Sequence, residues 1–153
     1  MEAVEPATLY YTGHEMILGF FEGDSPPPGL IEDETWPLRC DVAAMQTEVV
    51  GQGVLVAVLD SGVDAAAHPG LAASVLAGGQ EAFDYVDNDF EPLDEGDGPA
   101  HGHGTLVADL IHQVAPGAGL LALRVMDDAG IVRTVDVARA VRRAADAGAR
   151  VIN

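Results

Sequence analysis

An aspartate and a histidine with small neighbours are the residues of this chain whose types and spacing could do chemistry. Asp60 begins an Asp-Ser-Gly segment directly after an apolar run, and His103 stands between two glycines that leave its imidazole unobstructed. A carboxylate held against one imidazole nitrogen fixes the tautomer of the ring, and the other nitrogen can then accept a proton from a hydroxyl nucleophile. The pair therefore has the residue types of an acid–base site for nucleophilic catalysis.

Other interpretations of these residues stay open on the sequence alone. An Asp-Ser-Gly segment after a strand is more often an ordinary turn, and Ser61 has no independent support as a nucleophile. His101 and His103 form a His-x-His pair that could bind zinc together with Asp60 or Asp64. No third histidine or cysteine cluster is visible, so a metal-dependent hydrolase is kept as a minor alternative.

The residue patterns around the pair predict the elements that must position it. Val54–Leu59 is a continuous apolar run that ends at Asp60, which is typical of a buried parallel strand. Apolar residues at helical spacing predict a helix over Thr105–Val114, and the Thr105 hydroxyl could cap it. A short helix is also expected over Asp41–Val49, with Val42, Met45 and Val49 on one face.

The same alternation of strand and helix continues to the last residue. A strand is predicted over Leu120–Met126, a helix from Thr134 or Asp136 to Gly148, and a further strand from Arg150. This pattern predicts an α/β fold, a parallel sheet with helices on both faces. Ligands of such sheets bind at the carboxyl ends of the strands, where Asp60 is expected to lie.

The segment 81–97 is strongly acidic and has no basic residue. We expect most of it to be a solvated surface loop. Because hard cations prefer clustered oxygen ligands, a calcium site at Asp87, Asn88 and Asp89 is possible. The acidic residues of the segment are Glu81, Asp84, Asp87, Asp89, Glu91, Asp94, Glu95 and Asp97.

Four sequence blocks resemble the subtilisin-like serine proteases, or subtilases. Their order and spacing make the resemblance specific, and it covers about residues 31–153. It implies that 31–153 is the N-terminal portion of a peptidase domain, with 1–30 as an N-terminal extension of uncertain fold. The blocks are VAVLDSGVD (Val56–Asp64), HGHGTLVA (His101–Ala108), VAPGAGLLALRVMDDAG (Val114–Gly130) and DVARAVRRAADAGARVIN (Asp136–Asn153).

The resemblance also implies a role for each matching residue. Asp60 orients His103, His103 is the general base of an Asp-His-Ser triad, and Gly130 falls where the family has its substrate edge. The serine block of the family and its oxyanion-binding asparagine have no counterpart in the 153 residues. We therefore expect a sheet truncated after the fourth or fifth strand and a chain that is inactive by itself.

Composition limits the other functions. The formal net charge is −18 and all seven basic residues are arginine, so nucleic-acid binding is not expected. No apolar run approaches the ~18 residues of a membrane span. The single cysteine, Cys40, excludes an internal disulfide.

The expected partner is a peptide or protein substrate, provided that a C-terminal half completes the site. No cofactor is required for this chemistry, although calcium is possible. The N-terminus has no signal-peptide pattern, so a cytoplasmic location is the default even though the family is often extracellular. The competing hypothesis is a binding or assembly module, in which the half-fold presents apolar surface to a partner.

Overall fold

The computed structural model describes residues 42–66, 70–76 and 81–153. The predictions made for 1–30, for the boundary with 31–153 and for Cys40 lie outside the described residues. No described helix is both long and apolar enough to cross a membrane.

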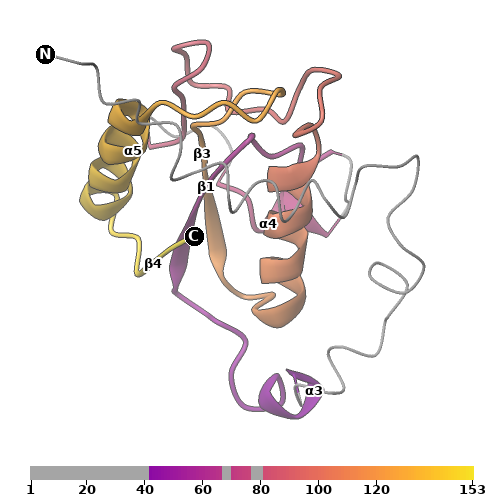
Figure 1. Ribbon diagram of the computed structural model, residues 1–153. Helices are drawn as coiled ribbons and strands as arrows, with labels where there is room; N and C mark the ends of the chain where they lie inside the picture. The colour runs from indigo at the N-terminus through magenta and orange to yellow at the C-terminus, as the bar shows by residue number, and fades with distance from the viewer. Residues whose placement is uncertain (1–41, 67–69, 77–80) are drawn as a thin grey trace, which may run out of the picture.

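A parallel sheet forms the centre of the described structure (Figure 1). Its strands are β1 (Leu55–Asp60), β2 (Phe83–Asp84), β3 (Gly119–Arg124) and β4 (Val151–Ile152), in the spatial order β2-β3-β1-β4. Each neighbouring pair runs parallel, and β1 and β3 pair along their whole length, from Leu55 with Gly119 to Asp60 with Arg124. The predicted parallel sheet is confirmed.

Helices cover both faces of the sheet, as predicted. Helix α4 (His103–Val114) follows the loops after β1, and α5 (Thr134–Asp146) connects β3 to β4. In Figure 1 the two helices stand on opposite sides of β1 and β3.

Strand alternation explains this arrangement. Val56 and Val58 of β1 belong to the apolar core on the α4 side, whereas Ala57 between them belongs to the core on the α5 side. In β3, Leu120 and Leu121 divide between the two cores in the same way. Because both faces of each strand are covered, both strands read as continuous apolar runs.

The first described helix is shorter than predicted. Helix α3 spans only Val42–Met45, so the expected extent to Val49 is wrong, and the side chains of Met45 and Val49 are exposed. The Thr47 hydroxyl donates to the carbonyl of Ala44, and this local bond competes with continuation of the helix. A single 3-10 turn, η1 (Leu71–Ala73), places the fully buried Leu71 against the core on the α4 side.

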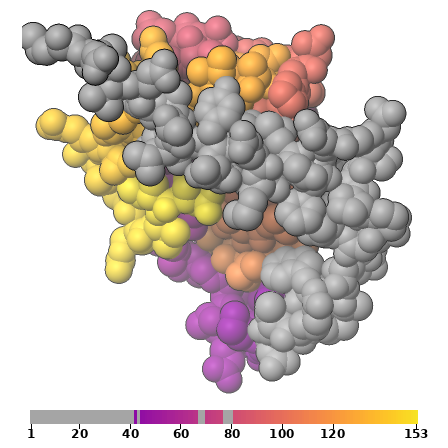
Figure 2. Space-filling view, viewed as in Figure 1, coloured from indigo at the N-terminus to yellow at the C-terminus, as the bar shows by residue number. Residues whose placement is uncertain are grey.

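The loops at the carboxyl ends of the strands pack against one another. The turn after β3 is bound to the segment 97–100, because the Asp128 carboxylate accepts from the amides of Asp97 and Gly98 and the Asp128 carbonyl accepts from Ala100. Figure 2 shows these loops, drawn in pink and orange, together at the top of the molecule. This end of the sheet holds the residues that the sequence singled out.

Candidate catalytic site

Asp60 and His103 meet at the carboxyl end of the sheet. Asp60 is the last residue of β1, and His103 is the first residue of α4. The distance between Nδ1 of His103 and Oδ1 of Asp60 is 2.6 Å. Because a carboxylate oxygen accepts, Nδ1 carries the proton of this hydrogen bond. The fold thus brings together the two residues that the sequence paired.

Glycines allow the helix to start this close to the strand. Gly102, the residue before α4, has a φ of 87°, a left-handed conformation that favours glycine. At Gly104 a Cβ would lie 2.2 Å from the carbonyl oxygen of Gly62, so a side chain there would force the helix away from the strand. The glycines on either side of His103 therefore set where its imidazole lies.

The electrostatic surroundings of His103 favour its charged form. The hydrogen bond to Asp60 raises the pKa of His103 above its usual value of 6.5, burial opposes this, and the charges of Asp60 and Asp94 add to the increase. The His103 side chain keeps 19% of its surface exposed. Within the part of the chain that the structure describes, Nε2 of His103 has no hydrogen-bond partner. The second ring nitrogen is thus free to accept a proton.

Ser61 lies beside Asp60 but serves the junction between strand and helix. Its side chain is buried, its hydroxyl donates to Oδ1 of Asp94 over 3.1 Å, and it accepts from the amide of Gly104 over 3.0 Å. Both hydroxyl contacts are made inside the fold. This geometry agrees with the expected turn role and gives no support to a nucleophile at Ser61.

Asp94 is a site residue that the sequence did not reveal. The sequence places Asp94 in the acidic segment that is expected to be mostly solvated, yet only 6% of the residue is exposed. Its carboxylate accepts hydrogen bonds from amides at the start of α4. The prediction that Thr105 caps α4 is wrong, because the Thr105 hydroxyl donates to Asp94 over 2.6 Å instead. No signal in residue type or spacing separates Asp94 from its acidic neighbours.

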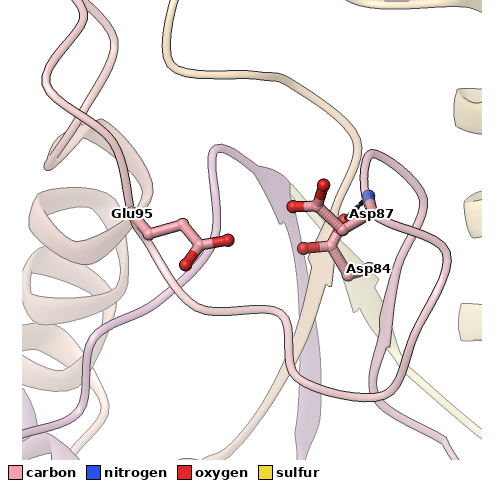
Figure 3. Close-up of side chains that lie close together, drawn as sticks. All are labelled: Asp84, Asp87 and Glu95. Atoms are coloured by element: carbon pink, nitrogen blue, oxygen red, sulfur yellow. Dashed lines mark hydrogen bonds between the residues drawn. The ribbon is translucent and has the colours of Figure 1, made fainter.

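A second buried acid in the same segment pairs with a buried arginine. Nη1 of Arg124 donates to Asp84 over 2.9 Å, to Asp87 over 2.8 Å and to Glu95 over 2.9 Å. Figure 3 shows the three carboxylates turned toward one another. Burial acts to lower the pKa of Arg124, but the hydrogen bonds and charges of Asp84 and Asp87 outweigh it, and the pKa is raised. Arg124 therefore stays charged and neutralises part of this cluster.

The predicted calcium ligands are only partly brought together. Asp87 lies with Asp84 and Glu95, whose ligand oxygens fall within 4.8 Å of one another, and among the described residues Asp89 belongs to no such group. The Asp89 carboxylate accepts from the amide of Glu91 over 2.8 Å. A cation at Asp87 would compete with Arg124, so these side chains do not form a free set of ligands.

The remaining predicted site residues, Gly130 and His101, lie in loops. Gly130 has a φ of 84° in the turn after β3, and its amide donates to the carbonyl of Asp127. His101 is exposed, and no group of three potential metal ligands among the described residues includes His101 or His103. The zinc interpretation therefore lacks a ligand set in the described structure.

Comparison with known proteins identifies the family of the chain. The model of the subtilase family matches residues 51–153. The thermophilic serine proteinase of Bacillus sp. (strain AK1) is 39% identical over 111 residues, which are 66% of this chain and 25% of that protein. Thermitase of Thermoactinomyces vulgaris is 37% identical over 113 residues, 67% of this chain and 37% of that protein.

Among solved structures, that of a lanthipeptide protease superposes with a TM-score of 0.63 and 32% sequence identity. The match covers 76% of this chain and 32% of that one. The chain thus spans about a quarter to a third of the length of the relatives it matches. The family model covers most of the chain, and the chain belongs to the subtilase family.

Proposed function

We propose that this chain provides the acid–base half of an Asp-His-Ser peptidase site, with Asp60 as the orienting acid and His103 as the general base. The observation that carries the proposal is the 2.6 Å hydrogen bond between Nδ1 of His103 and Oδ1 of Asp60. It fixes the tautomer in which Nε2 is unprotonated, and within the described residues Nε2 has no partner.

The chemistry follows from this tautomer. Nε2 of His103 takes the proton of a serine hydroxyl as that oxygen attacks the peptide carbonyl, and the resulting imidazolium is stabilised by Asp60 without proton transfer to the carboxylate. The serine and the donors that stabilise the oxyanion must come from the rest of a subtilase domain. The substrate class is a peptide or protein, and the 153-residue chain alone is expected not to hydrolyse it.

An apolar groove supports completion of the site by further polypeptide. It has a volume of about 690 Å³ and is lined by Val107, Leu110, Ile111, Val114, Ala115 and Asn153. Leu110 and Val114 are 40% and 37% exposed on the outer side of α4. Exposed apolar surface of this kind marks an interaction face, and the two relatives have more than three fifths of their length outside the matched part.

The tautomer of His103 tests the proposal directly. Nitrogen-15 NMR of the labelled chain is expected to show His103 protonated at Nδ1 and unprotonated at Nε2 when the ring is neutral. In Asp60→Asn this preference and the raised pKa of His103 should both be lost, whereas Asp64→Asn should leave them unchanged. A neutral ring that carries its proton on Nε2 in the wild-type chain would rule the base role out.

Fluorogenic-peptide hydrolysis tests the second half of the proposal. The purified chain is expected to show no turnover above the His103→Ala variant. Turnover that disappears in His103→Ala would show that the chain is complete as an enzyme and would contradict the need for further polypeptide.

The second candidate function, a binding or assembly module, is favoured by the same groove. A chain that stays monomeric, shows no Nδ1–H tautomer at His103 and binds a partner through Leu110 would favour it. Metal analysis of the purified protein tests the third alternative, a metal-dependent hydrolase. That alternative requires bound zinc, so a protein without zinc would exclude it.

A further inference from the structure

We infer that Asp94 is a positioning residue for the Asp60–His103 pair, because its buried carboxylate ties the end of β1 to the start of α4. The inference rests on the proposed function, since the position of His103 matters only if His103 transfers protons.

The Asp94 carboxylate accepts four hydrogen bonds, two on each oxygen. Oδ1 accepts from the Ser61 hydroxyl over 3.1 Å and from the Gly102 amide over 2.9 Å. Oδ2 accepts from the Thr105 amide over 3.0 Å and from the Thr105 hydroxyl over 2.6 Å. Every donor belongs either to the residue after Asp60 or to the residues around His103.

This arrangement holds one segment by the Ser61 hydroxyl and the other by the Gly102 and Thr105 amides and the Thr105 hydroxyl. Asp60 and His103 are 43 residues apart in the chain, and each lies next to a residue that Asp94 contacts. The first amides of a helix have no acceptor within the helix, and a negative charge close to them is favourable. Asp94 satisfies two such amides of α4, and Ser61 satisfies the amide of Gly104 between them.

Asp94 acts on His103 through its charge as well as through its hydrogen bonds. Among the described residues, the groups that raise the pKa of His103 are Asp60 at the end of β1 and Asp94 in the loop before α4. Loss of the Asp94 charge should therefore lower the pKa of His103. A residue that only stabilised the fold would have no such effect.

The Asp94→Asn variant tests the inference in the intact 153-residue chain, with Asp97→Asn as the matched control. Asp97 is an exposed acid of the same loop whose amide, not its carboxylate, makes the bond to Asp128. NMR would follow the low-field Nδ1 proton of His103 and the titration of the imidazole. In Asp94→Asn we expect that proton to exchange with water about tenfold faster, because hydrogen bonds to a charged acceptor are lost, and the pKa of His103 to fall. Asp97→Asn should match the wild type.

Two outcomes would overturn the inference. One is an Asp94→Asn chain whose His103 proton exchange and titration equal those of Asp97→Asn. The other is a chain that loses stability in urea while both His103 signals keep their wild-type values, which would show a structural role only. The inference is tested by proton exchange and titration of His103, whereas the proposed function is tested by the tautomer of the neutral ring. The two can therefore fail separately, and none of these measurements needs proteolysis.

Thr105→Val provides the test if Asp94→Asn does not fold. It removes the 2.6 Å bond to Asp94 and the acceptor of the Asp64 amide, and it keeps the charge of Asp94 in place. The Nδ1 proton of His103 should then exchange faster while the titration is unchanged. Wild-type exchange in a folded Thr105→Val chain would overturn the inference.

Discussion

One short hydrogen bond and a histidine that is only partly buried define the Asp60–His103 pair at the level of single residues. Its consequence is a coupling between protonation and stability. The pKa of His103 is raised in the folded state, so the protonated ring is stabilised by folding. The same shift means that the neutral ring, the form that the proposed base role requires, predominates only above the raised pKa.

The first prediction concerns this pH dependence. Because the pKa of the folded state is raised, the stabilisation from the His103–Asp60 pair is fully present below the unfolded pKa of 6.5 and is lost as the pH rises through the higher folded value. Urea unfolding of the wild type and of Asp60→Asn should therefore differ more at about pH 5.5 than at about pH 8.5. An equal difference at both pH values would mean that the pair does not titrate as described.

The sequence revealed the pair but not the residue that supports it. Asp60 and His103 could be predicted because Asp60 directly follows a clear apolar strand and His103 stands between two glycines before a clear helix. Asp94 could not be predicted, because a buried acid and a solvated acid look alike in a segment with eight acidic residues. Only the tertiary position of α4 decides which carboxylate meets the unpaired amides.

At the level of elements, the site depends on how closely α4 approaches β1. The predicted order of strands and helices was correct, because continuous apolar strands and amphipathic helices carry strong periodic signals. The inward face predicted for α5 was only partly correct: Ala140 and Ala144 are buried, but Val141 is 42% exposed. The start of α4 was predicted two residues late, since Gly102 rather than a polar side chain precedes it. The end of α3 was missed because the local bond of Thr47 is not visible as a break in the apolar pattern.

The second prediction tests the close approach of the two elements. In Gly104→Ala the new Cβ would lie 2.2 Å from the carbonyl oxygen of Gly62 and 3.0 Å from Cβ of Asp60. We expect a loss of about 1–3 kcal/mol in unfolding free energy and loss of the low-field His103 proton, because backbone must move. Gly102→Ala is the control for backbone strain alone: nothing lies within 4 Å of its Cβ, and its φ of 87° should cost about 1 kcal/mol. Equal losses in both variants would contradict the steric explanation.

The third prediction concerns the link between β3 and the acidic loop. Arg124→Met would leave the fully buried Asp84 without its charged partner, and breaking a buried pair in this way typically costs about 3–5 kcal/mol. Arg142→Met is the matched control, because that side chain is 85% exposed and lies 3.8 Å from Asp146. It should change the unfolding free energy by about 0.5 kcal/mol or less. Chemical denaturation measures both, and a small effect of Arg124→Met would show that Asp84 finds another partner.

The same link explains why the calcium prediction is hard to make from sequence. A run of acidic residues predicts a bound metal ion. In the structure, however, three of these acids accept hydrogen bonds from Arg124, which lies in a strand further along the chain. The arginine looks like one more charged residue until the sheet places it. We therefore keep calcium binding at Asp87, Asn88 and Asp89 as a prediction, with competition from Arg124 as its physical obstacle.

For the molecule as a whole, the most consequential surface is the apolar groove on α4. Helical periodicity places Leu110 and Val114 on the apolar face of the predicted helix, and 40% and 37% of their surfaces are exposed. The pattern was correct about which face is apolar. Periodicity does not predict whether that face is covered by other residues of this chain or by further polypeptide.

The fourth prediction follows from this groove. The isolated chain should bind a hydrophobic dye and self-associate at high concentration, because exposed apolar surface of this extent favours association. Leu110→Gln should reduce both effects, as measured by dye fluorescence and sedimentation. Val141→Gln, on an exposed position of α5 outside the groove, is the control and should leave them unchanged. Equal reduction by both variants would mean that association is not specific to the groove.

The position of β1 has a final consequence for the behaviour of the site on heating. β1 pairs with β3 on one side and β4 on the other, and Asn153 extends the pairing by bonds to Ala57 and Leu59. Central strands of this kind are among the last parts of a fold to open, and Asp94 and Ser61 bind the start of α4 to the end of β1. Asp60 and His103 should therefore belong to one cooperative unit. Warming should keep the two side chains together until the sheet itself unfolds.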